Sequence, residues 1–227
     1  MAELAGEKAD RAKPVMGFTV ERVNALSDGV FAVAITLLGL SIAVPSITGT
    51  VTNSKLAHGL AQVWPHFFAY ALSFVIIAMF WISHHSLFSV IRRVDRVLIW
   101  INIFYLLLIV FLPYSTNLLS LFGETAVATV LYASVLASTA ILQAAMGYYA
   151  MRGHRLVDDE LDMKYLDEFL RNSLSTAAVF IISIAIAIFN VTVAQFSWML
   201  LFFTPLLELL IFKRKSGKSA AEEPEGI

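Results

Sequence analysis

The chain has 227 residues, 59% of them apolar, and a formal net charge of -1 at pH 7. Its mean hydropathy of +0.77 is far above that of an ordinary soluble domain and indicates a polytopic membrane protein. The absence of cysteine excludes disulfides, thiol catalysis and thiolate metal sites. The near-zero net charge gives no electrostatic signal for nucleic-acid binding. The polar first 15 residues lack the apolar core of a cleavable signal peptide.

Six apolar runs are long enough to cross a bilayer as helices, which takes about 20 residues each. The runs are continuously apolar rather than alternating, so helices are favoured over β-strands. We therefore predict an all-α, polytopic membrane protein with six transmembrane helices per subunit. The predicted spans are residues 21–44, 65–91, 97–118, 125–151, 170–189 and 196–212.

The connections between these runs are polar. Residues 46–62 are expected to form a loop that includes a short helix, LAHGLAQ. Residues 152–169 contain six acids among apolar side chains and are predicted to form a partly helical linker. Pro113 should kink or end the third span, because proline lacks the N–H of a helix interior.

The basic residues define an orientation. If six spans are drawn, fifteen of the sixteen Lys and Arg fall on one side of the membrane, and only Lys55 falls on the other. Lys and Arg are concentrated on the cytoplasmic side of membrane proteins. Both termini are therefore predicted to be cytoplasmic.

Residues 22–40, RVNALSDGVFAVAITLLGL, carry an acid inside the first span. An acid at that depth is costly and marks a candidate functional site. On an ideal helix with about 100° between residues, Asp28 lies about 180° from Leu37, so it points away from an apolar stripe with one hydroxyl. The residues of that stripe are Val33, Thr36, Leu37 and Leu40.

Polar groups of the second and third spans lie at the level of Asp28. We expect a hydrogen-bonded cluster of Arg, Ser, Asp and His side chains near the cytoplasmic end. Arg22 and Asp28 are six positions apart and are not neighbours on one helix face, so their partners must come from other helices or subunits. The available groups are Trp81, Ser83, His84, His85, Ser86 and Asn102.

Simpler interpretations exist for each feature. An apolar stripe on a membrane helix more often faces lipid or core than a pore, and a threonine usually bonds its own i−4 carbonyl. The pair His84 and His85 has no third ligand at metal-binding spacing. Glu208 is an expected interface residue near Lys213 or Arg214. We see no positive signal for an intramembrane enzyme.

Residues 22–40 resemble a family signature. The pattern Arg22-x-x-x-Leu26-Ser27-Asp28, followed by GVFAVAITLL, is similar to that of the lysosomal potassium channel family and its prokaryotic homologues, in which Phe usually stands at the Leu26 position. WISHHSLF (81–88) and NIFYLLLIVFLPYSTNLL (102–119) are similar to the same family. The resemblance covers all six predicted spans.

The resemblance implies a six-helix subunit that assembles as a homotetramer, with the pore lined by the first helix and no re-entrant filter loop. It places the hydrophobic constriction, or gate, on Val33, Leu37 and Leu40, and the hydroxyl level that aids selectivity on Thr36. Val33 is smaller than the Ile or Leu that usually forms the first of these apolar layers in the family. A structural polar network is also implied, formed by Arg22, Ser27, Asp28 and either His84 or His85.

We therefore expect a potassium-permeable cation channel in the cell membrane rather than an enzyme. Its channel domain should span residues 19–213, between cytoplasmic tails at 1–18 and 214–227. The expected partners are potassium ions in transit, other copies of the chain and the lipid bilayer. We expect no nucleic acid, metal or cofactor.

The alternative function is a proton-coupled secondary transporter that uses Asp28, Glu208 and the second-span histidines. The chain has no inverted repeat and no pair of Gly/Pro-broken helices, which such transporters commonly show. A non-transporting membrane scaffold also stays open, and a flux assay separates it from a channel.

Overall fold

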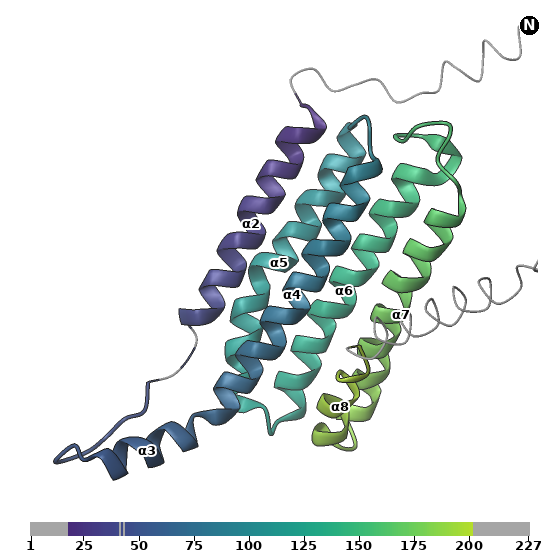
Figure 1. Ribbon diagram of the computed structural model, residues 1–227. Helices are drawn as coiled ribbons and strands as arrows, with labels where there is room; N and C mark the ends of the chain where they lie inside the picture. Colours follow the sequence, from purple (N-terminus) through teal and green to yellow (C-terminus); the bar gives the residue numbers. More distant parts are fainter. Residues whose placement is uncertain (1–17, 41, 43, 202–227) are drawn as a thin grey trace, which may run out of the picture.

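A computed structural model describes residues 18–40, 42 and 44–201 (Figure 1). Within that part the regular structure is helical, with no strand beyond an isolated bridge between Ile91 and Val157. The helices are α2 (Val20–Leu40), α3 (Asn53–Gln62), α4 (Trp64–Val90), α5 (Arg96–Phe122), α6 (Ala126–Met151), η2 (Arg152–His154), α7 (Lys164–Ala187) and α8 (Val191–Ser197).

Five of these helices, α2, α4, α5, α6 and α7, are long and apolar enough to cross a membrane. They confirm the prediction of an all-α, multi-pass membrane protein. The sixth predicted span, residues 196–212, is described only as far as residue 201, so most of it lies outside the described part of the chain.

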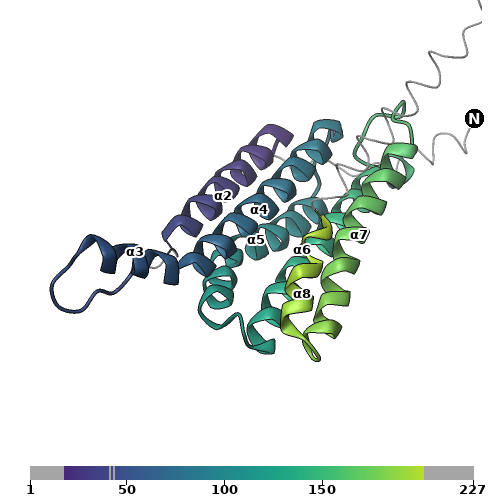
Figure 2. The ribbon, with the colours of Figure 1, turned by 60° about the horizontal axis from the view of Figure 1, so that its bottom comes forward.

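The long helices run side by side as a bundle (Figures 1 and 2). Helix α2 packs on α4 and α5, α6 packs on α5 and α7, and α8 packs on α7. Among the described residues, the first helix is therefore held mainly through one side, by two neighbours. Helix α3 projects away from the foot of the bundle.

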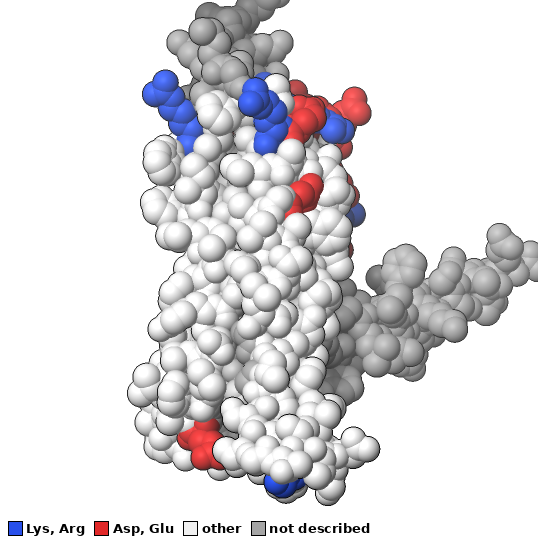
Figure 3. All heavy atoms as spheres, turned by 90° about the vertical axis from the view of Figure 1, so that its left-hand side faces the viewer, with Lys and Arg blue, Asp and Glu red and all other residues white. Residues whose placement is uncertain are grey.

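Charged side chains gather at the two ends of the face shown in Figure 3 and leave a broad uncharged belt between them. The start of α2, the α4–α5 connection and the α6–α7 connection all lie at one end (Figure 1). These segments carry most of the basic residues in the described part, whereas Lys55 of α3 lies at the opposite end. This distribution is what a protein that crosses a bilayer requires.

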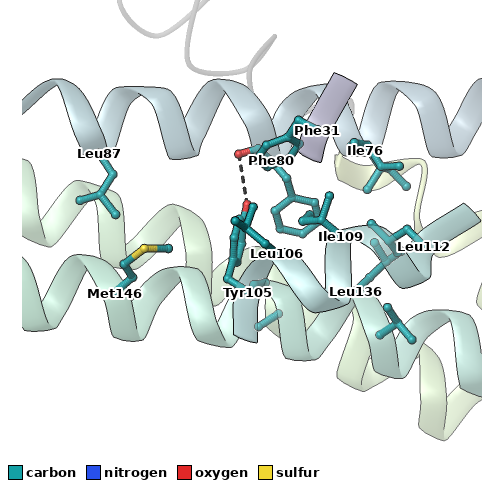
Figure 4. Packing of buried hydrophobic residues seen from close by; sticks show 14 of the residues in the cluster. Phe31, Ile76, Phe80, Leu87, Tyr105, Leu106, Ile109, Leu112, Leu136 and Met146 are labelled. Carbon is teal, nitrogen blue, oxygen red and sulfur yellow. Dashed lines mark hydrogen bonds between the residues drawn. The ribbon is translucent and has the colours of Figure 1, made fainter. Parts of the chain in front are cut away.

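Aromatic and aliphatic side chains fill the interior between the helices (Figure 4). Several buried polar groups are paired across helices, as an apolar interior favours. Tyr105 of α5 donates its hydroxyl to the carbonyl of Phe80 on α4 at 3.3 Å. Ser73 Oγ of α4 lies 2.9 Å from both Thr116 Oγ1 of α5 and Tyr132 Oη of α6. These bonds connect the three central helices.

Several boundaries differ from the sequence prediction. Helix α2 ends at Leu40, and Pro113 is accommodated inside α5 rather than ending it. Helix α7 begins six positions early, at Lys164, because Leu166 and Phe169 share a buried face with the later part of the helix. The expected short connection at 190–195 is instead mostly helix α8. The short helix expected within 46–62 is confirmed as α3.

Candidate functional site

One face of helix α2 is buried against its neighbours. The buried positions follow helical spacing and are Val23, Ser27, Phe31, Ala34 and Leu38. Phe31, Ala34 and Leu38 are 1% exposed or less, so this face is fixed by close packing. In the described part of the chain α2 contacts mainly α4 and α5, and these contacts set the direction of its other face.

The opposite face of α2 is exposed in the subunit. Val33 is 53% exposed, Leu37 39% and Leu40 81%, and Thr36 is also exposed. The four residues that the sequence grouped as a stripe are therefore together, outside the subunit core. They form an apolar face that only lipid or another protein surface can cover in a membrane.

The hydroxyl of Thr36 is the polar group of this stripe. Its Oγ1 donates to the carbonyl of Val33 at 2.9 Å, one residue closer along the helix than the i−4 bond that threonine usually makes. A hydroxyl has one hydrogen to donate and two lone pairs. With the hydrogen committed to the helix, the lone pairs are left as acceptors for a donor or a cation.

A chain of buried hydrogen bonds ties α2 to the bundle. Asn102 of α5 donates from Nδ2 to Ser27 Oγ at 3.0 Å, and Ser27 donates to the carbonyl of Val23 at 2.9 Å. On the other side, Asn102 Oδ1 lies 2.9 Å from His84 Nε2 of α4. Since an amide oxygen only accepts, His84 carries its proton on Nε2. Three helices are joined through one amide.

Aromatic rings fix the orientation of His84. Its ring stacks on Phe88 with centroids 4.4 Å apart and on Tyr105 with centroids 5.5 Å apart. Phe31 of α2 lies against it at 5.7 Å. The imidazole is fully buried, so its position relative to Asn102 is set by packing as well as by the hydrogen bond.

Asp28 has a separate partner. Trp81 of α4 donates its indole N–H to Asp28 Oδ1 at 2.8 Å. His85 lies beside that indole, with ring centroids 5.7 Å apart and planes tilted by 30°. His85 is exposed, and it contacts Trp81 rather than the Ser27–Asn102–His84 chain.

Arg22 stands apart from both groups. It is exposed, and within the described residues its guanidinium makes no hydrogen bond or ion pair. The predicted polar network is therefore divided within one subunit: Ser27 and His84 share a chain of bonds, Asp28 and His85 meet at Trp81, and Arg22 joins neither. Glu208 lies outside the described residues.

The sequence prediction included Asn102 among the available groups but not as the centre of the chain of bonds. The available signal was a lone amide in a long apolar run. Buried polar side chains in membrane helices commonly bond across helices. That rule favours Asn102 as a connector but does not give its partners, which depend on how α4 and α5 pack.

Comparison with known proteins places this geometry in a family. Residues 22–113 match the family described as endosomal/lysosomal potassium channel TMEM175. A Streptomyces collinus protein named as a potassium channel is 37% identical over 145 residues, which cover 62% of this chain and 69% of that protein. The chain belongs to the TMEM175 family. This is a family of potassium channels, not of enzymes.

Two further comparisons agree with this assignment. A Chamaesiphon minutus protein named as a potassium channel is 32% identical over 173 residues, covering 75% of this chain and 85% of that protein. The crystal structure of a lysosomal potassium-selective channel TMEM175 homologue from the same organism superposes with a TM-score of 0.72 at 28% identity. The superposition covers 82% of this chain and 96% of the solved chain. The matched region 22–113 contains nearly all of α2, all of α4 and most of α5, hence both faces of the first helix.

Proposed function

We propose that this TMEM175-family chain forms a homotetrameric, potassium-permeable cation channel in which the exposed face of α2 from each subunit lines the ion pathway. The observation that carries the proposal is the division of α2 into two faces. One face is packed and hydrogen-bonded to α4 and α5, and the other leaves Val33, Leu37 and Leu40 exposed. Four such faces around an axis would cover one another and enclose a path.

Rings of these apolar side chains would act as the gate. Along a helix with a rise of about 1.5 Å per residue, Val33, Leu37 and Leu40 form three layers spread over about 10 Å. A narrow apolar ring excludes water and so excludes ions, and widening it admits them.

A ring of four Thr36 side chains would lie between the Val33 and Leu37 layers and aid selection of the permeating ion. Because the Thr36 hydrogen is committed to the Val33 carbonyl, four hydroxyl oxygens would present lone pairs to the axis and replace part of the hydration shell of the ion. No carboxylate lies on the exposed face between Val33 and Leu40. Selectivity would then depend on dehydration and be modest.

The orientation proposed for the channel follows its basic residues. The end of the bundle that carries the start of α2 and the connections 91–95 and 152–163 would be cytoplasmic. Both termini would then be in the cytoplasm of a multi-pass cell-membrane protein, with tails at 1–18 and 214–227 around a channel domain at 19–213. The ions in transit are its proposed ligand.

Potassium flux into liposomes tests the proposal. The wild-type chain should carry potassium down a gradient, and Leu40→Asn should raise the leak, because a polar side chain hydrates the constriction. Since Leu40 is 81% exposed, this change removes little packing within the subunit. Trp100→Asn is a matched control: this residue is 59% exposed and belongs to another helix, α5. Unchanged flux for Leu40→Asn and Leu37→Asn, in correctly assembled protein, would refute the pore assignment.

A further inference from the structure

Helices α4, α6 and α7 line a groove of about 360 Å³ on the bundle. Much of its lining is polar, although these helices cross the membrane. Lipid tails offer no hydrogen bonds to such groups, so a protein segment with a polar side chain suits the groove better than lipid does. The polar lining residues are Ser83, Gln143, Arg171, Asn172, Ser173, Ser175 and Thr176.

The chain after α8 leads into this groove. Trp198 donates its indole N–H to Ser183 Oγ of α7 at 2.9 Å, which sets these two residues side by side. Leu201, the last described residue, is 4% exposed and lines the groove. Two antiparallel helices rise equally per residue, so a helix that continued along α7 would bring residue 208, ten positions after Trp198, level with Ser173, ten positions before Ser183.

Glu208 is the acid of this continuing run, and helix geometry would turn it towards the groove. It follows Leu201 by seven positions, or about 700°, so the two side chains share one face to within about 20°. An acid inside a membrane segment needs a cationic or hydrogen-bonding partner. Arg171 lies two positions from Ser173, about 3 Å along the helix axis, and its long side chain spans that difference.

We propose that residues 202–212 pack into the groove as a helix and that Glu208 forms an ion pair with Arg171 inside the subunit. Ser173 provides a second donor for the carboxylate. It is 4% exposed, and its hydroxyl has no hydrogen-bond partner in the part of the chain that the structure describes. A carboxylate accepts several hydrogen bonds and can serve both groups at once.

The basic residues of the tail are poorer partners for Glu208. Lys213 and Arg214 follow it by five and six positions, whereas side chains meet on a helix at three or four. Pro205 lies within the run, but Pro113 is accommodated inside α5 of the same chain. The ion pair makes Glu208 a structural group rather than a proton carrier, and it does not depend on the pore proposed for α2.

Disulfide formation in the full chain tests the packing directly, because the chain has no cysteine of its own. Thr176→Cys combined with Thr204→Cys joins positions one residue apart in level, so most chains should form an intrachain disulfide under mild oxidation. The matched control replaces Thr204 with Leu207, which is turned about 120° from Leu201 and should leave both thiols free to react with a maleimide. Equal oxidation of the two pairs, or disulfides only between chains, would overturn the proposal.

Charge reversal tests the ion pair itself. Arg171→Glu and Glu208→Arg should each lower the melting temperature by about 5–10 °C, since each leaves like charges together, and the double variant should recover most of the loss. Arg214→Glu combined with Glu208→Arg is the control and should not recover it. Additive losses in the Arg171 and Glu208 double variant, or recovery with Arg214→Glu, would overturn the pair. The disulfide result decides the packing even if the charge variants fail to fold.

Discussion

Replacing Asn102 by leucine should destabilise the subunit by about 2–4 kcal/mol, because the change removes the connector between α2 and α4. Two hydrogen bonds are lost, one to Ser27 and one to His84, at about 0.6 kcal/mol each by the average found in membrane proteins. The N–H of His84 is then left buried with no acceptor, which adds about 1–3 kcal/mol. Ser27 keeps its own bond to the Val23 carbonyl, so it contributes less.

Ser115→Ala is the matched control on the same helix. Ser115 is as buried as Asn102, but its hydroxyl bonds only the Leu112 carbonyl of its own helix, at 2.9 Å. Thr116 also reaches that carbonyl, so the carbonyl stays paired and the expected cost is about 1 kcal/mol or less. Unfolding in mixed micelles by titration with dodecyl sulfate, followed by circular dichroism, measures both variants. Equal destabilisation by Asn102→Leu and Ser115→Ala would refute the connecting role of Asn102.

Two further substitutions separate packing and assembly from ion selection. Asp28→Ala removes the acceptor of the Trp81 N–H and should lower the yield of assembled channel in size-exclusion chromatography. The reversal potential of the channels that do assemble should stay the same. An assembled variant with altered ion selectivity would contradict this prediction. Gly147→Ala should lower the melting temperature, because a Cβ there would lie 2.4 Å from Phe169 Cε1 and overpacking costs about 1–3 kcal/mol. An unchanged melting temperature would show that α6 and α7 separate freely at this point.

The sequence predicted the long membrane helices well because twenty-residue apolar runs have few other structures available. The two faces of α2 also followed from helix geometry, since its contacts with α4 and α5 use one side. The start of α7 could not be predicted from the sequence. Leu166 and Phe169 stand among acids, and their burial depends on the close approach of Phe169 to Gly147 on another helix.

The contacts of the polar groups could also be predicted only in part from the sequence. Their levels along the helices could be read from the sequence, but rotation about each helix axis could not. That rotation brings Asn102 between Ser27 and His84, directs Asp28 to Trp81, and leaves Arg22 on the exposed face. A single chain also gives no contacts with other copies, so the proposed tetramer rests on the family resemblance and on the uncovered face of α2.

Cysteine accessibility along α2 tests most directly whether its exposed face lines the ion pathway. The chain contains no cysteine, so single substitutions need no background changes. Thr36→Cys, on the exposed face, should react with a charged, membrane-impermeant thiol reagent and lose potassium current as it does so. Leu38→Cys, two residues further along the helix and fully buried, should keep its current. Current that is insensitive to the reagent at Thr36, or sensitive at Leu38 alone, would contradict the account.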